Sequence, residues 1–377
     1  MLASMLRELR YLLHNKWDLA MVVIAPLFII LLFGSMFYTG KPDHLPIAVI
    51  DQDQSELSRN ISRDLSLNHT LDVKYQTQNQ TEVENLLNQT KIWGYVHIPA
   101  GAEQRLVNAQ DAQISIVFNQ SFFSVGNTVS SAMLLSVLNG MADFAGESYL
   151  GNVLPYLSMP TPNVKISTLY NPNLSYEFYL EPFVIPAILH LLLCCCVAFA
   201  IGQELKRETV PDWANQDDYI QALFAKILVY VVIYTFWTWA WMFWLIEIRG
   251  WFVAGSLVMI LAGQILLYFA YAFISSTVVL ASKNLGRTFG FIAVYGGSSL
   301  SFAGVTLPLN NAPIFTQFWS MIIPYTPYAR LQTEQWVVGS DISISVWSFL
   351  ILLGYCLFYF ALSVLLMKKL VKEQSNA

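Results

Sequence analysis

A charged stretch stands between two long apolar segments of the chain. The range Gln203–Trp213 reads QELKRETVPDW, and five of its eleven residues carry a charge, against 12% of the whole chain. Thr209 is placed to be an N-cap, with Pro211 in the first helical turn and Asp212 reaching back as in a capping box. The stretch predicts a short exposed helix suited to docking in a groove of another protein. An ordinary solvated loop is the alternative.

Signatures of catalysis are absent from the rest of the sequence. It has no Gly-x-x-x-x-Gly-Lys-Ser/Thr phosphate loop, no His-Glu-x-x-His and no Gly-x-Ser-x-Gly. The four cysteines lie in apolar segments without metal-ligand spacing. His190 is the sole ionisable residue well inside its apolar segment, so it is either a functional group or a neutral histidine hydrogen-bonded between helices. We expect no enzyme activity, no metal site and no cofactor on this chain.

The composition is that of an integral membrane protein. Over 377 residues the hydrophobic fraction is 55% and the mean hydropathy is +0.49. A spanning helix needs about 20 mostly apolar residues, because lipid offers the backbone no hydrogen-bond partners. Six uncharged runs qualify: Leu19–Phe37, Phe183–Ile201, Ile227–Ile246, Trp251–Ser282, Thr288–Leu307 and Ile342–Met367. Their continuous apolarity favours helices over barrel strands. The sequence thus predicts an α-helical integral membrane protein with six transmembrane helices.

The 20 Lys and Arg residues predict the orientation of these helices. Eleven lie before the first span, in the loops after the second and fourth spans, and in the C-terminal tail. The short connections on the opposite side carry only Arg249 and Arg330. Because positively charged loops stay in the cytoplasm, we expect both termini and the charged stretch to be cytoplasmic. Residues 40–182 are then expected outside.

The long segment 40–182 holds the soluble part of the chain. Its periodicity predicts strands and helices, the strands at Pro46–Asp51, Leu71–Tyr75, Gly94–Ile98 and Ile114–Phe118 and the helices at Ser55–Leu67 and Thr81–Leu87. Thr81 and Glu84 have the spacing of a capping box at the start of the second helix. The pattern predicts a small extracytoplasmic α/β domain, inserted between the first two spans.

Two further features of this segment bear on its role. It contains 14 acidic and 7 basic residues, which fits either a solvated acidic surface or the capture of cationic substrates. The runs Ser124–Phe144 and Leu150–Ser158 are apolar and helix-like. We expect these two runs to pack the domain against the membrane.

In the order and spacing of these features, the chain resembles the membrane subunit, or permease, of ABC-2 type exporters with a large extracytoplasmic domain between the first two spans. Residues 1–17 resemble the family's amphipathic interfacial helix, with Arg7, Arg10 and His14 on its polar face. Its apolar face carries Leu2, Met5, Leu6, Leu9, Leu13 and Trp17. Ile47–Ser58 resembles the family's Asp-x-Asp and Ser-x-Leu-Ser segment, and Gly94–Gly101 resembles its Gly-x-hydrophobic-x-Ile-Pro turn.

Two later segments carry the same resemblance with departures. Gly202–Thr209 resembles the coupling segment Arg-Glu … Gly-Thr, with Glu208 where Gly is usual. Phe302–Gly304 and Pro324–Tyr328 resemble the outer re-entrant segment. The resemblance implies four regions: an interfacial helix at 1–17, a first transmembrane helix at 18–39, the extracytoplasmic domain at 40–182, and spans two to six at 183–377. The last region includes a coupling loop at 202–226 and an outer re-entrant segment at 305–341.

The resemblance implies a function in transport. The chain would be the permease of an ATP-driven exporter in the bacterial inner membrane, moving a hydrophobic or amphipathic, drug-like or lipid-like substrate out of the cytoplasm or the inner leaflet. A separate ATPase subunit would bind ATP and Mg and dock beneath the coupling loop. The chain would form a homodimer, or a heterodimer with a homologous permease. Membrane lipid and a periplasmic adaptor are further implied partners; nucleic acid is not one.

Two sets of residues are expected to serve this function. Coupling to the ATPase is expected at Glu204, Arg207, Glu208, Thr209, Asp212 and Trp213, with Trp213 as the apolar anchor. Close packing between two permeases, or within one subunit, is expected at Gly296, Gly297, Ser301 and Gly304.

Two other classes of function stay open. A membrane sensor or scaffold that displays an extracytoplasmic binding domain would still need a partner for its output, because the cytoplasmic segment 202–226 is too short for an output domain. A membrane-embedded enzyme is disfavoured, because no polar catalytic cluster occurs within the apolar runs.

Overall fold

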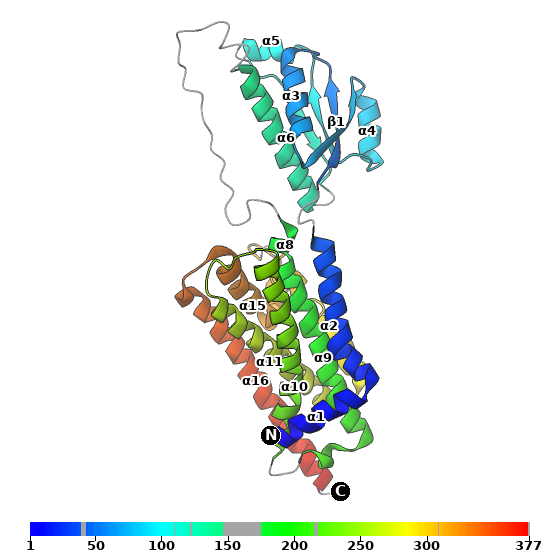
Figure 1. Ribbon diagram of the computed structural model, residues 1–377, viewed down its shortest axis with the longest axis vertical. Helices are drawn as coiled ribbons and strands as arrows, with labels where there is room; N and C mark the ends of the chain where they lie inside the picture. The colour runs from blue at the N-terminus through cyan, green and yellow to red at the C-terminus, as the bar shows by residue number, and fades with distance from the viewer. Residues whose placement is uncertain are drawn as a thin grey trace. The chain divides into compact units, whose positions relative to one another are not determined.

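The computed structural model describes residues 1–38, 43–108, 110–120, 123–145, 175–214, 218–307 and 309–375 (Figure 1). These residues belong to two compact units. One unit comprises Met1–Gly40 and Thr168–Ala377, and is called the helical unit below. The other comprises Lys41–Ser167 and is called the α/β unit.

The helical unit begins with α1 (Leu2–His14) and α2 (Lys16–Phe37). After the α/β unit the chain continues through α8 (Tyr176–Tyr179), α9 (Glu181–Arg207), the 3-10 turn η2 (Val210–Asp212), α10 (Tyr219–Phe243) with its π-helical end η3 (Trp244–Ile248), and α11 (Leu257–Ser282). The last part contains α12 (Leu285–Tyr295), α13 (Ser299–Phe302), α14 (Ile314–Ile322), α15 (Tyr325–Gln332) with the π-helical η4 (Thr333–Val338), and α16 (Ile342–Ser375).

Five helices among the described residues are long and apolar enough to cross a membrane: α2, α9, α10 with η3, α11 and α16. They correspond to five of the six predicted spans. The sixth, Thr288–Leu307, does not form one continuous helix, because α12 ends at Tyr295 and α13 covers only Ser299–Phe302. Gly296 and Gly297 lie at the break. A glycine costs about 1 kcal/mol relative to alanine inside a helix, so this pair weakens the run where it would need to continue.

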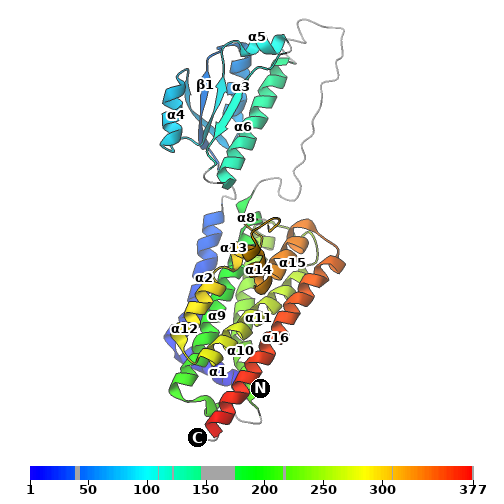
Figure 2. The same ribbon diagram turned by 180° about the vertical axis from the view of Figure 1, so that it is seen from behind.

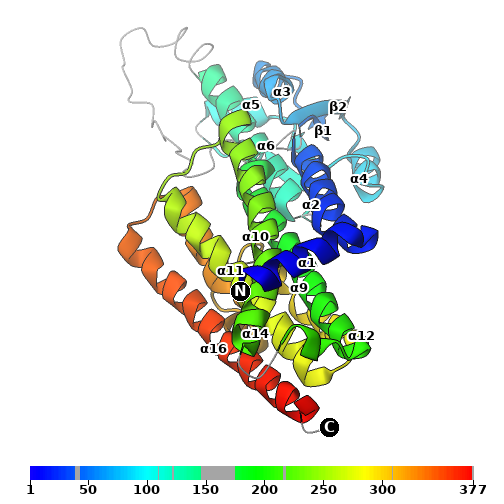
Figure 3. The ribbon, with the colours of Figure 1, turned by 60° about the horizontal axis from the view of Figure 1, so that its bottom comes forward.

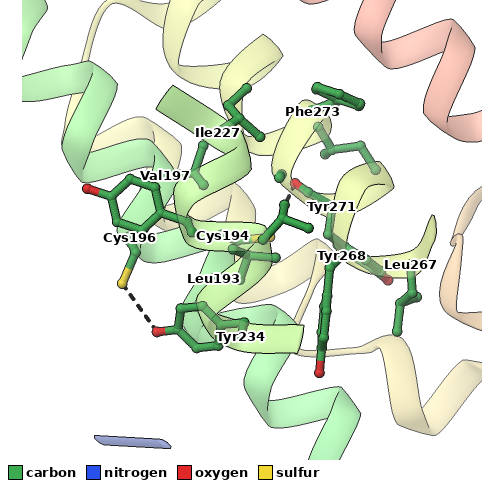
Figure 4. Close-up of a cluster of buried hydrophobic side chains, with 14 of the residues drawn as sticks. Leu193, Cys194, Cys196, Val197, Ile227, Tyr234, Leu267, Tyr268, Tyr271 and Phe273 are labelled. Atoms are coloured by element: carbon green, nitrogen blue, oxygen red, sulfur yellow. Dashed lines mark hydrogen bonds between the residues drawn. The ribbon is translucent and has the colours of Figure 1, made fainter. Parts of the chain in front are cut away.

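The core of the helical unit lies where α9, α10 and α11 meet (Figure 4). Leu193, Ile227 and Leu267 come from these three helices and are fully buried. Some polar groups in this core are partnered, whereas Thr235 Oγ1 and Ser276 Oγ have no hydrogen-bond partner among the described residues. The Tyr234 hydroxyl lies 3.3 Å from the Cys196 thiol, and the Ser275 hydroxyl donates to the Cys194 carbonyl at 2.6 Å. Each pair avoids a cost of several kcal/mol, which is the cost of an unpaired polar group in lipid.

Two of the long helices, α2 and α16, are much less buried than the helices of this core. In the most apolar stretch of each helix only 17% of the residues are buried within the chain, against 72% for α9. Large side chains such as Ile24, Phe28, Leu357 and Phe358 are exposed along them. A helix that is apolar all round and not covered by protein fits a lipid environment. The exposed faces of α2 and α16 therefore agree with the membrane composition of the chain.

The α/β unit contains a four-stranded sheet in the order β2-β1-β3-β4. The strands are β1 (Leu45–Asp51), β2 (Leu71–Thr77), β3 (Gly94–Ile98) and β4 (Ser115–Phe118). β1 pairs in parallel with β2 and β3, and β4 pairs antiparallel with β3. The helices are α3 (Glu56–Leu67), α4 (Gln80–Asn88), α5 (Ala102–Val107) and α6 (Phe123–Asp143).

Side chains of β1 alternate between two buried layers. Ile47 and Val49 join a cluster with α3 and α6, whereas Ala48 and Ile50 join a cluster with Val83 of α4. Figure 2 shows α4 on one face of the sheet and α3 and α6 on the other. Burial on both faces explains why β1 reads as a continuous apolar run, as expected for a central parallel strand.

Two expectations about this unit need correction. The run Ser124–Phe144 forms most of α6, but it packs on α3 and the sheet of its own unit through Val129, Met133 and Val137. α3 and α6 approach closely at Gly140, where an added Cβ would lie 2.7 Å from the Ile61 Cα. The expectation that this run packs against the membrane is therefore wrong for this face of α6. The run Leu150–Ser158 lies outside the described residues.

The second correction concerns the start of α4. Its N-cap is Asn79, whose side chain accepts hydrogen bonds from the backbone N–H groups of Thr81 and Glu82. The predicted capping box of Thr81 and Glu84 is not formed. An asparagine two residues earlier reaches the free N–H groups first, because its carbonyl group is a strong N-cap acceptor. In α3 a capping box does form, between Ser55 and Ser58.

The Asp-x-Asp motif has a structural role in the α/β unit. The Asp51 carboxylate accepts from the backbone of Asp53 and Gln54 and from the Ser58 hydroxyl. The Asp53 carboxylate accepts three backbone N–H groups at the start of α5, from Gly101 at 2.6 Å, Ala102 at 3.1 Å and Glu103 at 3.0 Å. Burial acts to raise the pKa of Asp53, but a hydrogen bond with the Ser55 side chain and these backbone hydrogen bonds outweigh it and hold the pKa below its usual range.

We predict that Asp53→Asn loosens the start of α5. The amide keeps one acceptor oxygen but loses the charge, and a hydrogen bond to a charged group contributes about 1.5–3 kcal/mol. Because the folded-state pKa of Asp53 is depressed, its contribution is present above the unfolded value near 3.8 and is lost as the pH falls through the folded value. Hydrogen exchange of residues 101–107 in the full chain should therefore be faster in the variant at pH 7, and the difference should shrink below about pH 4.

The matched control is Asp72→Asn, which changes an exposed carboxylate on β2. It should leave exchange at 101–107 unchanged. Equal protection of these residues in wild type and Asp53→Asn at neutral pH would contradict the role assigned to Asp53.

Candidate functional site

The helix α1 packs against α10 and α2 at one end of the helical unit (Figure 3). Its apolar residues Leu6 and Leu13 are exposed, as is Trp17 at the start of α2, which fits the predicted interfacial face. Glu8 and Leu12 lie on a different face of α1 and are buried at 4% and 3% exposure. A buried glutamate on a surface helix is unusual, and its partners define the site.

Lys226 of α10 is the partner of Glu8. The Lys226 ammonium lies 2.7 Å from Glu8 Oε2 and 3.1 Å from Glu204 Oε1, near the end of α9. The Tyr230 hydroxyl donates to the other oxygen of Glu8 at 2.7 Å. The side chains of Lys226 and Glu8 are 7% and 6% exposed. One cation between two carboxylates thus joins α1, α9 and α10; these contacts are called the Lys226 network below.

Buried charges of this kind bind their partners tightly. Removing one member of a buried pair costs about 3–5 kcal/mol, because the other charge is left without a partner away from water. Trp213 limits access to the network, since its ring lies over Lys226 at 5.1 Å. The Thr209 hydroxyl donates to the second oxygen of Glu204. The network therefore fixes the chain from the end of α9 to Trp213 onto α10.

Further hydrogen bonds hold α1 along its length. Arg7 donates to the Asp212 carbonyl at 2.7 Å, and the Tyr11 hydroxyl donates to Gln203 Oε1 at 3.3 Å. Asn15 follows α1 and donates to the Tyr11 hydroxyl. Burial raises the pKa of Tyr11, so its hydroxyl stays protonated and remains a donor at neutral pH. α1, the end of α9 and the loop after it are thus connected at several points.

The predicted coupling residues fall on the last turn of α9 and on the loop after it, but the local structure differs from the expected one. α9 continues through Arg207, and Glu208 ends it in the left-handed conformation with φ of 59°. Only the three-residue turn η2 follows, in place of a docking helix. Thr209 makes no capping hydrogen bond there, because its hydroxyl is used by Glu204.

The predicted coupling residues also differ in exposure. Arg207, Glu208 and Asp212 are exposed, together with Lys206 and Pro211. Trp213 is only 9% exposed and belongs to the core of this chain. This burial does not fit the expectation that Trp213 is the apolar anchor for the ATPase. Its large apolar ring is buried against Lys226 and the neighbouring helices instead of being presented to a partner.

Sequence reasoning missed the central residues of this site. Glu8, Lys226 and Tyr230 were not singled out, although Lys226 is a lone cation within the apolar helix α10. Glu8 stands among the leucines of α1 in the sequence. An ionisable residue inside such segments is a signal that a partner exists. What the sequence does not reveal is that the partner lies 218 residues away.

The small residues Gly296, Gly297, Ser301 and Gly304 lie around the break between α12 and α13, on separate elements from the Lys226 network. Gly296 is buried, and an added Cβ there would lie 3.0 Å from Leu191 Cδ1. Gly297 and Ser301 are exposed. Gly304 has a φ of 80°, which few other residues adopt. Gly296 therefore serves packing within the chain, whereas Gly297 and Ser301 are free for outside contacts.

His190 lies in the interior next to this break. It is fully buried, its Nδ1 is 3.1 Å from the Pro186 carbonyl, and its ring centroid is 4.0 Å from that of Tyr271. These contacts agree with a neutral histidine packed between helices. No group of three or more His, Cys, Asp or Glu side chains that could hold a metal ion occurs in the part of the chain that the structure describes.

A second buried ion pair lies at the other end of α10. Arg249 makes two hydrogen bonds to the Glu177 carboxylate, at 2.6 and 2.9 Å, and Trp251 donates to the same carboxylate at 2.8 Å. Arg249 also donates to the Tyr38 carbonyl and stacks over the Tyr38 ring at 4.2 Å. The hydrogen bonds that Arg249 donates to Glu177 raise the pKa of Arg249. Arg249 thus joins the end of α2 to the start of α8.

Comparison with known proteins gives one finding. A family model described as ABC-2 family transporter protein matches residues 16–365. No curated protein and no solved structure matches the chain. The family match spans four of the five long apolar helices entirely and most of α16. Because it covers most of the sequence, the chain belongs to the ABC-2 family of transporter proteins, as a multi-pass membrane component.

Proposed function

We propose that the chain is the permease subunit of an ATP-driven exporter. It moves a hydrophobic or amphipathic substrate out of the cytoplasm or the inner leaflet, and a separate ATPase subunit binds ATP and Mg. The observation that carries the proposal is the Lys226 network, which fastens α1 and the loop 204–213 to the long helices α9 and α10. The family match supports the same function.

The Lys226 network supplies the rigid link between helices that transmission of force from an ATPase requires. A partner that pushes on the loop 204–213 would move α1, α9 and α10 together, because separating them would expose Glu8 and Lys226 without partners. Packed elements of this kind move as rigid bodies between discrete arrangements. The docking surface of the ATPase is proposed at the exposed side chains around η2, chiefly Glu208 and Asp212.

The proposal includes the orientation and the assembly. Both termini and η2 lie in the cytoplasm of a bacterial cell, and the α/β unit lies outside the inner membrane. Two permease copies, identical or homologous, are proposed because one docking surface engages half of an ATPase dimer. Gly297 and Ser301 are exposed small residues suited to close helix contact between copies.

The orientation is tested by thiol labelling in intact cells. A membrane-impermeant maleimide should modify a cysteine placed at Gln89, at the end of α4, and should spare one placed at Lys369, near the end of α16. Disrupting the cells should make the second site reactive. The unmodified chain is the control, since Cys194, Cys196 and Cys356 are buried and Cys195 lies inside an apolar helix. Labelling at Lys369 but not at Gln89 in intact cells would reverse the proposed orientation.

The docking surface is tested by reversing its exposed charges. The double variant Glu208→Lys with Asp212→Lys should remain inserted but retain less ATPase subunit on purification. Each exposed ion pair lost costs up to about 1 kcal/mol, so a reduction in affinity of roughly fivefold or more is expected. ATP hydrolysis by the complex, with the ATPase identified by mass spectrometry, should fall accordingly, and the chain alone should hydrolyse no ATP.

Glu247→Lys is the matched control, since it reverses an exposed carboxylate at the opposite end of α10. It should leave ATPase recovery unchanged. Equal recovery with the Glu208 and Asp212 double variant, or steady ATP hydrolysis by the chain alone, would rule out the proposed coupling.

The Lys226 network is tested by a double-mutant cycle. Lys226→Met leaves Glu8 and Glu204 without their cation, so the thermal midpoint of the purified chain should fall by several degrees, as expected for a loss of about 3–5 kcal/mol. Adding Glu8→Gln removes one unpaired charge and should restore part of this loss. A thermal midpoint unchanged by Lys226→Met would show that the network contributes no rigidity.

A further inference from the structure

An apolar groove runs along α2 between α9 and α12. It has a volume of about 470 Å³ and is lined by Ile24, Ala25 and Phe28 of α2, by Phe199 of α9 and by Phe289 of α12. On α2 the lining residues extend from Trp17 to Phe28. At a rise of 1.5 Å per residue this is about 16 Å, roughly half of a hydrocarbon core of about 30 Å. The groove therefore has the length of one leaflet.

A second cavity of about 580 Å³, with charged residues in its lining, continues from this groove. The two share Trp17, Asp18 and Phe199 in their linings. The second cavity adds Lys206 and Arg207 at the end of α9. Both cations are exposed, and neither forms an ion pair within the described part of the chain. Together the two cavities make an amphipathic site, apolar along α2 and cationic at its mouth.

Asp18 is the one carboxylate among the residues that line the second cavity. Asp18 lies between the two cavities and accepts a hydrogen bond from Asn15 Nδ2 at 2.7 Å. Lys206 and Arg207 follow each other in sequence at the end of α9, so two positive charges stand against one negative charge. The mouth favours an anionic group, and clustered Lys and Arg next to a span attract anionic lipid by about 1 kcal/mol per residue.

We propose that this composite groove binds an anionic phospholipid of the cytoplasmic leaflet. The phosphate group lies at Lys206 and Arg207, and one acyl chain lies along α2 between Ala25, Phe199 and Phe289. The leaflet follows from the orientation proposed above, whereas the binding itself does not depend on an ATPase. A second copy of the chain fits this surface less well, because a symmetric contact would bring its own Lys206 and Arg207 toward these cations.

The proposal is tested first on the unmodified chain. Delipidated protein is incubated with phosphatidylglycerol that carries a photoreactive group on one acyl chain, in detergent and without ATPase. Adducts should concentrate on the peptides that contain residues 17–28 and 195–199. Adducts distributed evenly over the lipid-exposed helices, or concentrated on α16, would overturn the proposal. Because no substitution is made, misfolding cannot explain either result.

Variants distinguish the contribution of the acyl chain to binding from the contribution of the headgroup. Native mass spectrometry of the chain with phosphatidylglycerol or phosphatidylcholine of identical acyl chains should show tighter binding of phosphatidylglycerol by roughly fivefold. Lys206→Glu with Arg207→Glu should abolish this preference. Ala25→Phe should fill the groove and weaken binding of both lipids. Unchanged binding in all three measurements would overturn the proposal.

Two matched controls are present in the chain. Gly354→Phe adds the same side chain at an exposed glycine of α16, where an added Cβ meets nothing within 4 Å. Lys368→Glu with Lys369→Glu reverses two consecutive exposed cations near the end of α16. Both should bind lipid as the wild type does. A cysteine at Ile24 that readily forms disulfide-linked dimers in the membrane would assign the groove to a second copy and overturn lipid binding there.

Discussion

The helical unit depends on the enclosure of the Lys226 ammonium group between Glu8 and Glu204. A lysine at this depth would be costly alone, since a charge transferred from water into protein loses several kcal/mol of solvation. The contacts of Lys226 with Glu8, Glu204 and the ring of Trp213 offset this cost. They can all form in only one arrangement of α1, α9 and α10. The ion pair therefore specifies how three helices meet, which apolar contacts alone would leave less strictly defined.

This arrangement gives the two ends of α10 different partners. At one end Lys226 holds a surface helix and a loop, and at the other end Arg249 binds the neighbouring Glu177 and Tyr38. Between them α10 contributes Ile227 and Tyr234 to the apolar core (Figure 4). A helix fixed by charges at both ends and by packing in the middle has little freedom to bend. In the coupling proposed above, displacement of one end would then be passed to the other.

Local patterns predicted much of the fold, whereas contacts between distant residues were not predictable. The strands and helices of the α/β unit follow periods of two and 3.6 residues, and the predicted ranges match β1, β3 and α3 within a few residues. The sequence predicts a span across Gly296 because hydropathy measures how apolar the side chains are and takes no account of helix propensity. The charged stretch is exposed only in part, at Lys206–Glu208 and at Pro211 and Asp212, and its predicted helix is not formed. Its structure depends on Lys226 and Arg7, which belong to α10 and α1.

The pairing of Arg249 with Tyr38 and Glu177 has a further consequence for how the chain can change in evolution. These two residues flank the whole α/β unit, and one guanidinium group holds both, within 2.8 and 2.9 Å of Nη2. A domain whose two connections leave a scaffold at neighbouring points can be lengthened, exchanged or deleted without stretching that scaffold. The residues between them are thus free to diversify independently of the membrane helices. Related chains with another domain at this position, or with only a short linker, are expected to keep the same helical unit.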